Sequence, residues 1–470
     1  MLPDGVKKLF TNRVLSATIF FLACVSRVAI QVYNFFPGTD RSFQLVAAKN
    51  LLAGDGITVN QVLAGNLSRE LYLPLAGWPP GYSFFVGIIA FFFNNNVHLA
   101  ALLFDVITIL IFVYFSRRIL ITLGCSANVV NLFTLVVGFF VYPFSEVSTT
   151  DSNALAFFIC AFSMTLDFIK DNKKGNQFAI GLALINFISP FLRYMFIPLS
   201  LVIPLYLLYI GKKTNDKRVF NGGLWAFAIN LLLLGALLIF QIRSTGAPIY
   251  INPVEKGYFP SNLLHLYPVI VGSFINIGFY YSIAASLGIL DYGQYSELFQ
   301  LLSALVIVLL VILFVKFHFK KSRQQLTLRD HYVYIGGLIS LLTLLILITL
   351  SLRYGPSRNN NSEWTYVIEP RYVAFITIFL QQLVFIFIFD NWQRIRNRLL
   401  KLIGFLLLIL LGLETIHGLY FTSKILITNR KNFHANKRYS EQKQFIKSYV
   451  LQLKKNHPSH DIVFFSRKDQ

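Results

Sequence analysis

The chain has 470 residues, of which 55% are hydrophobic and 16% aromatic, and its mean hydropathy is +0.60. This composition exceeds what a soluble domain tolerates, so it excludes a soluble globular protein and predicts an integral membrane protein. The net charge of +21 does not indicate nucleic-acid binding, because the basic residues lie between hydrophobic runs and not on one folded face. The three cysteines lie in or beside apolar stretches without CxxC spacing, which indicates neither a disulfide framework nor a zinc site.

Eleven hydrophobic runs approach the roughly 20 residues that cross a bilayer. They lie at about 14-34, 97-116, 128-146, 152-169, 177-190, 195-210, 219-240, 297-316, 331-352, 371-389 and 402-421. The first run is too long for a signal-peptide core and lacks a small-residue cleavage site, so we expect it to be retained as a helix. The predicted fold class is an all-α polytopic membrane protein with about eleven transmembrane helices.

Lysine and arginine are unevenly distributed when the connections between these runs are assigned alternately to the two sides. Segments on one side hold 21 of the 42 basic residues and those on the other hold nine, although the latter are longer. Cytoplasmic loops carry the excess of Lys and Arg, so the side with few basic residues is predicted to face outward. The tail at 422–470 then also lies outside, despite its eleven basic residues, because long segments cross regardless of charge.

The first outer connection, residues 35–82, is a polar loop of more than forty residues. Near its start it reads Phe35-Phe36-Pro37-Gly38-Thr39-Asp40-Arg41, and it ends with Trp78-Pro79-Pro80-Gly81-Tyr82. Ordering so long a loop costs backbone entropy, which indicates a function. We expect this loop to form the floor of an active site at a membrane surface.

Two further apolar stretches do not fit as simple spans. Gly81 to Phe93 has about thirteen residues, a length more typical of an interfacial or re-entrant helix. The stretch 260–290, within a second large outer loop at 241–296, is interrupted by proline and glycine and breaks the alternation of sides in the same way. We expect both to lie on or dip into the outer leaflet, around an outward cavity roofed by loops.

Ionisable residues at the outer ends of the predicted spans are candidates for function, since charge at membrane depth is costly. The acidic ones are Asp40, Glu146, Asp151 and Glu369, and the basic ones next to apolar sequence are Arg193 and Arg371. A structural alternative for Asp40 is a helix cap, and for each arginine it is an interface anchor beside an aromatic residue.

A carboxylate at headgroup level suits glycosyl transfer from a lipid-phosphate sugar. The leaving group is already a stable phosphate anion, so one carboxylate base for the acceptor hydroxyl is sufficient and no general acid is required. The donor phosphate needs a cation, and arginine binds phosphate with a planar fork of donors. We therefore expect Asp40 to be the catalytic base, with Arg371 first and Arg193 second as phosphate-binding residues. Glu369 and Tyr372 flank Arg371 as substrate-binding candidates, and Trp78 or Tyr82 could stack against sugar.

On these residues the chain resembles the GT-C superfamily of glycosyltransferases that use polyprenyl-phosphate sugars, which includes protein O-mannosyltransferases and the aminoarabinose transferases of lipid A. The similar elements are, in order, Asp40, the run from Ala47 to Gly56, Trp78-Pro79-Pro80-Gly81-Tyr82, Ser244-Thr245-Gly246-Ala247-Pro248 and Glu369-Pro370-Arg371-Tyr372. The resemblance implies Asp40 as catalytic carboxylate in an outward cavity, with juxtamembrane helices at 40–53 and 79–93. Many relatives have Glu-Pro near Asp151, which makes this aspartate a second catalytic candidate.

The expected organisation is a transmembrane catalytic domain at 1–421 and a small extracytoplasmic segment at 422–470. The expected partners are a polyprenyl-phosphate-linked sugar, a lipid, glycan or protein acceptor and the bilayer of a bacterial inner membrane, with the site facing the periplasm or exterior and no nucleic acid bound. No cofactor is firmly indicated. A divalent metal ion near Asp40 is an alternative to arginine for neutralising the donor phosphate.

Other interpretations remain open. Asp105, in the middle of a span, could line the cavity or be a buried carboxylate satisfied by Ser or Thr hydroxyls. Glu414 and His417 have a spacing that can bind metal, but no further ligands stand nearby in the sequence. An O-antigen-type polymerase or ligase is expected to place its main loop late in the chain. A transporter of lipid-linked sugars is expected to show broken helices in two repeated halves, and no repeat is evident.

Overall fold

A computed structural model describes much of the chain, in a set of separate residue ranges. They are 13–33, 39–63, 66–140, 150–247, 257–265, 326–353, 357–358, 364–365, 370–396, 398, 401–420, 422–424 and 427.

Eight helical segments in the described part are long and apolar enough to cross a membrane. They are α2 (Arg13–Tyr33), α5 (Val97–Thr122), α7 (Asp151–Lys170), α9 (Phe196–Thr214), α10 (Lys217–Thr245), α14 (Leu328–Arg353), the segment 371–389 that contains α15 (Ala374–Leu383) and η3 (Val384–Phe389), and 401–424. These segments make the chain an integral membrane protein of the polytopic helical class, as predicted.

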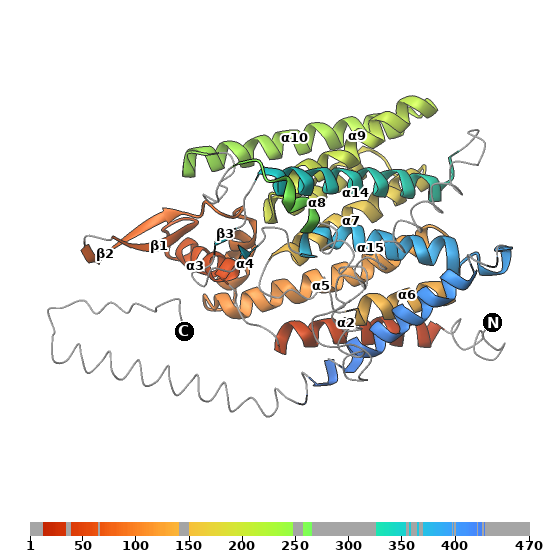
Figure 1. The fold of residues 1–470 in the computed structure, drawn as a ribbon. Helices are drawn as coiled ribbons and strands as arrows, with labels where there is room; N and C mark the ends of the chain where they lie inside the picture. Colours follow the sequence, from red (N-terminus) through yellow and green to blue (C-terminus); the bar gives the residue numbers. More distant parts are fainter. Residues whose placement is uncertain are drawn as a thin grey trace.

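The predicted number of eleven spans is not established by these helices. Two predicted runs correspond to shorter apolar helices, α6 (Ala127–Phe139) and α8 (Asn176–Leu192), and a third, 297–316, lies outside the described residues. The long helices lie side by side in one bundle, and α7 and the segment 371–389 are the most buried of the eight (Figure 1).

The first connection is folded into two helices and a hairpin at one end of the bundle (Figure 1). Helix α3 (Thr39–Ala53) and helix α4 (Gly81–Phe91) correspond to the two expected juxtamembrane helices. Between them, β1 (Thr58–Leu63) pairs antiparallel with β2 (Asn66–Pro74). The all-α prediction missed this hairpin, because both strands are rich in polar residues and lack the clear apolar alternation that marks a half-buried strand. A second strand pair, β3 (Ser357–Arg358) with β4 (Trp364–Thr365), is shorter still.

Two glycines shape this connection. Gly54 follows the last residue of α3 with φ of 92°, a left-handed conformation that ends the helix without the penalty of a Cβ atom. At the start of α4, a Cβ atom on Gly81 would clash with the backbone carbonyl of Phe191. The Pro-Pro-Gly-Tyr sequence therefore lets α4 pack closely against the end of α8, directly before Arg193.

Residues predicted to lie on the basic side gather at one end of the bundle. Arg118 pairs with Asp167 at 2.7 Å, and Lys170 donates to the carbonyl oxygen of Thr122 at 3.0 Å. Arg329 pairs with Asp390 at 2.6 Å. These contacts join the ends of α5, α7, α14 and η3, so the bundle has one end with a dense set of basic side chains. The hairpin and α3 lie at the other end.

Candidate active site

Four of the charged residues singled out in the sequence meet at the end of the bundle that carries α3 and α4. Asp40 lies in the first turn of α3, and Asp151 is the first residue of α7. Arg193 directly follows α8, and Arg371 lies in the short 3-10 helix η2 (Pro370–Val373) that leads into α15. Residues more than 300 positions apart in the sequence thus contribute to a single cluster, which we call the charge quartet.

Helix ends explain why these residue types stand at these positions. The N-terminus of a helix has a partial positive charge that favours an aspartate, as at Asp40 and Asp151. The C-terminus has a partial negative charge that favours an arginine, as at Arg193, whose own N–H donates to the carbonyl oxygen of Ser189 at 2.9 Å. The helix termini therefore support the charges before any substrate is considered.

Each arginine of the quartet reaches both aspartates. Nε of Arg193 donates to Oδ1 of Asp151 at 2.8 Å, and its Nη2 lies 3.4 Å from Oδ2 of Asp40. Nη2 of Arg371 lies 3.8 Å from the same Oδ2 of Asp40, and its Nε lies 3.6 Å from Oδ2 of Asp151. One strong hydrogen bond, between Arg193 and Asp151, is thus accompanied by three longer ion-pair contacts.

The quartet carries two positive and two negative charges in a largely buried place. The side chains of Arg193 and Arg371 are each 10% exposed and that of Asp151 is 7% exposed. Such burial is tolerated because the charges are paired. Asp40 is 28% exposed, which makes it the carboxylate of the four that a ligand reaches most easily.

Electrostatics hold Arg193 in its charged form. Burial lowers the pKa of Arg193, but the charge and hydrogen bond of Asp151, with contributions from Tyr372 and Asp40, outweigh burial and raise the pKa above its ordinary value. Burial also raises the pKa of the neighbouring Tyr194. The cluster therefore keeps at least one permanent cation next to two carboxylates.

The predicted aromatic contacts divide into two groups. The ring of Tyr372 lies 5.3 Å from the guanidinium carbon of Arg371, and Trp78 stacks on Phe43 with ring centroids 5.4 Å apart. Phe43 is three residues after Asp40 on α3, so a half-exposed aromatic pair stands on the helix of the exposed carboxylate. Tyr82 is fully buried and its hydroxyl accepts from Arg41, so its ring has no free face on which a sugar could stack.

Some predicted features fall outside the described residues. These are Glu146, Glu369 and most of the loop 241–296, and with them the roof of the predicted outward cavity. Within the described part of the chain, no group of three or more His, Cys, Asp or Glu side chains has a geometry that could hold a metal ion. Glu414 and His417 thus gain no third ligand there.

One buried pair was not predicted from the sequence. Arg41, counted only as an outer basic residue, forms a salt bridge with Asp105 in the first half of α5. A carboxylate within a span needs a partner, and an arginine near the membrane surface was a candidate. The sequence does not show which arginine folds inward, because that depends on how α3 packs on α5.

Comparison with known proteins finds similar chains among solved structures. No protein-family model and no curated protein matches the chain. Among solved structures, the chain is similar to the crystal structure of ArnT from Cupriavidus metallidurans in the apo state, with 13% identity and a TM-score of 0.37 over 88% of this chain and 77% of that one. A likeness this weak indicates no function by itself.

Proposed function

We propose that this protein is an integral membrane glycosyltransferase that moves a sugar from a polyprenyl-phosphate donor to an acceptor hydroxyl at the outer face of the membrane. The observation that supports this most is the charge quartet, in which Asp40, the most exposed of its four members, lies within 4 Å of two arginines. A general base and a phosphate-binding pair are the two things that this reaction requires.

Asp40 acts as the base in this proposal. Its contacts with Arg193 and Arg371 are 3.4 and 3.8 Å, longer than strong hydrogen bonds, so the carboxylate can accept the proton of an incoming hydroxyl. The hydroxyl oxygen forms a bond to the anomeric carbon as the bond between that carbon and the phosphate oxygen breaks. The proton stays on Asp40, and the lipid phosphate leaves with the electron pair.

Charge balance gives the arginines their role. The donor phosphodiester carries one negative charge, and the leaving phosphomonoester carries up to two. Protonation of Asp40 removes one negative charge from the quartet at the same moment, so the positive charges of Arg193 and Arg371 become available to the leaving phosphate. Such stabilisation is stronger in the transition state than in the ground state, which is the condition for catalysis.

Asp151 supports Arg193 in this proposal. Its 2.8 Å hydrogen bond fixes Arg193, and its side chain is only 7% exposed. We assign it to hold the guanidinium group in position and keep it charged. The stacked pair of Trp78 and Phe43, together with Tyr372, provides the aromatic surface next to the base on which the sugar would lie. Glu369 remains a substrate-binding candidate from the sequence.

The orientation follows from charge. The end of the bundle that holds Arg118, Lys170 and Arg329 is rich in basic residues, which favours the cytoplasmic side. The quartet would then face the periplasm or exterior of a bacterial inner membrane. A lipid, a glycan or a protein with an accessible hydroxyl would be the acceptor.

The test is transfer by the purified protein in lipid nanodiscs, with a radiolabelled polyprenyl-phosphate sugar and a panel of acceptor hydroxyl compounds. We expect labelled product with the wild type and a loss of at least about a hundredfold with Asp40→Asn, the size expected when a general base is removed. Full activity of Asp40→Asn would show that the base is misassigned. Transport of the intact donor in proteoliposomes, without cleavage of the sugar-phosphate bond, would support a transporter instead, and elongation of a lipid-linked glycan would support a polymerase or ligase.

A further inference from the structure

We propose that Asp105 is a positioning residue that holds Asp40 and Asp151 in one site, acting through Arg41 and Asn153. The contacts of Asp105 are features of the fold alone, whereas the expected effect of Asp105 on the reaction rate rests on the proposed function.

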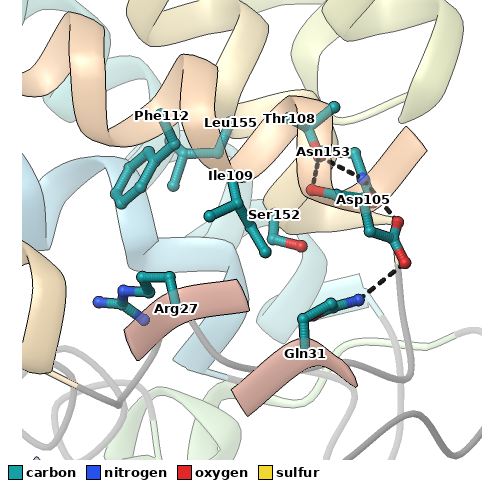
Figure 2. Close-up of a pocket in the computed structure, with 9 residues that line it drawn as sticks. All are labelled: Arg27, Gln31, Asp105, Thr108, Ile109, Phe112, Ser152, Asn153 and Leu155. Atoms are coloured by element: carbon teal, nitrogen blue, oxygen red, sulfur yellow. Dashed lines mark hydrogen bonds between the residues drawn. The ribbon is translucent and has the colours of Figure 1, made fainter. Parts of the chain in front are cut away.

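Asp105 lies on α5 and joins side chains from four other helices. Its Oδ2 accepts from Arg41 on α3 and, at 2.8 Å, from Gln31 on α2. Its Oδ1 accepts from Asn153 on α7 at 3.0 Å and lies 3.5 Å from the hydroxyl of Tyr82 on α4. Figure 2 shows Gln31 and Asn153 converging on this carboxylate from opposite sides. One side chain thus ties together five elements at the end of the bundle that carries the site.

The partners of Asp105 are near neighbours of the candidate carboxylates in the sequence. Arg41 directly follows Asp40 in the first turn of α3, and Asn153 stands two residues after Asp151 in the first turn of α7. Over so short a stretch of helix, the position of one residue determines that of the other. The two bonds to Asp105 therefore set the first turn of α3 relative to the first turn of α7.

The network is rigid because it is buried and satisfied. Arg41 is 1% exposed and Asp105 is 2% exposed at their side chains. Arg41 also donates to the hydroxyl of Tyr82 through Nε at 2.9 Å and Nη2 at 2.6 Å, which fixes the plane of its guanidinium group. Asn153 donates a further bond to the hydroxyl of Thr108 at 2.8 Å. A buried ion pair is a poor source of stability compared with apolar packing, which favours a role in specifying geometry.

A small cavity lies beside the network and affects how variants should behave. It has a volume of about 30 Å³ and is lined in part by Arg27, Gln31, Thr108 and Ser152 (Figure 2). A space of this size that has polar as well as apolar side chains on its wall can hold about one or two water molecules. Water there can complete the hydrogen bonds of a neutral side chain at position 105. We therefore expect Asp105→Asn, which keeps the shape of the aspartate, to fold.

The kinetic test separates positioning from mere stability. For Asp105→Asn we expect kcat to fall about thirtyfold while KM for the donor changes less than about threefold, because a small misplacement of the base slows the chemical step more than it weakens binding. The matched control is Asp390→Asn, which breaks the 2.6 Å pair with Arg329 at the opposite end of the bundle. We expect the control to lower Tm as Asp105→Asn does and to leave kcat unchanged. Equal loss of kcat in both variants, or unchanged kcat in Asp105→Asn, would overturn the proposal.

A second measurement is independent of the reaction. Cryo-electron microscopy of full-length Asp105→Asn in lipid nanodiscs should show that Asp40 has lost its 3.4 Å contact with Arg193, while the wild type retains it. An unchanged contact would overturn the proposal. If the wild type transfers no sugar, the proposed function fails, and this structural comparison alone decides the positioning role.

A conservative variant covers the case in which Asp105→Asn does not fold. Asp105→Glu keeps the charge opposite Arg41 and moves the carboxylate by one methylene. We expect it to fold, to show a partial loss of kcat and to displace Asp40 less than Asp105→Asn would. Wild-type kcat together with wild-type geometry in this variant would contradict the proposal.

Discussion

Nε of Arg193 lies 2.8 Å from Oδ1 of Asp151, although the two residues are 42 positions apart in the chain. The bond joins the end of α8 to the start of α7 and fixes a guanidinium group whose other side faces Asp40. Removing one partner of a buried ion pair destabilises a protein by more than the intact pair stabilises it, because the remaining charge is left uncompensated.

Asp151→Asn is therefore expected to destabilise the protein by about 3 kcal/mol, the lower end of the range for breaking a buried pair. The measurement is thermal unfolding in detergent, followed by intrinsic fluorescence. Asp171→Asn is the control, since Asp171 is an exposed aspartate after the other end of α7 and should change stability by less than about 0.5 kcal/mol. Equal stability of Asp151→Asn and wild type would contradict the importance of this pair.

The pH dependence of this contribution has a definite sign. Because the folded pKa of Arg193 is raised above its ordinary value, the stability that Arg193 contributes is present below that ordinary value and is lost only as the pH rises through the folded one. Both values lie above the range in which the protein can be studied. The difference in Tm between wild type and Arg193→Gln should therefore be the same at about pH 7 and about pH 10. A difference that disappears by pH 10 would mean that Arg193 titrates in that range.

Arginine at position 371 is expected to matter for its shape as well as its charge. Arg371→Lys keeps the cation but loses the planar fork that binds two phosphate oxygens, so we expect donor affinity to fall about tenfold. Binding of a fluorescent polyprenyl phosphate to the protein in nanodiscs measures this directly. Arg243→Lys, at an exposed position near the end of α10, should leave affinity unchanged. Equal binding by wild type and Arg371→Lys would remove Arg371 from the phosphate site.

Much of the candidate site could be predicted from the sequence, because its signal is local. Asp40, Asp151, Arg193 and Arg371 each stand where an apolar run ends, and an ionisable residue at such a point is conspicuous without knowledge of the fold. Their mutual distances were not predictable, since these depend on the packing of α3, α7, α8 and η2. The helices at 40–53 and 79–93 were expected from the resemblance, and the structure has α3 and α4 there.

The features that sequence reasoning missed depend on tertiary contacts. Arg41 adjoins Asp40, and arginine is a residue type usually found at the surface, yet the side chain of Arg41 points inward to Asp105. Tyr82 was a candidate for stacking against sugar as an outer aromatic residue, but its side chain is fully buried and its hydroxyl accepts from Arg41. The hairpin of β1 and β2 was not predicted from the sequence, because its polar strands pair through backbone groups, which side-chain patterns do not reveal.

Chelation of divalent metal ions is expected to leave the transfer rate within about twofold of its original value. Both carboxylates of the quartet already lie within 4 Å of two guanidinium groups, and these positive charges would repel a further cation, such as a metal ion, from the same oxygens. The measurement is the transfer rate after dialysis against EDTA, with and without added Mg²⁺ or Mn²⁺. A loss of activity that Mg²⁺ or Mn²⁺ restores would instead favour a metal ion as the partner of the donor phosphate.

Trp78 is expected to contribute to substrate binding and not to the chemical step. It stacks on Phe43, three residues from Asp40, and a half-exposed aromatic pair there can hold the apolar face of a sugar or the first isoprene unit. Loss of such a contact costs about 1 kcal/mol, so Trp78→Ala should raise KM about fivefold to tenfold and change kcat little, while Trp78→Phe should keep most of the affinity. Trp225→Ala is the control, because Trp225 is an exposed aromatic residue on α10 within a membrane-spanning helix. If Trp78→Ala lowers kcat and leaves KM unchanged, the aromatic pair positions α3 and does not bind substrate.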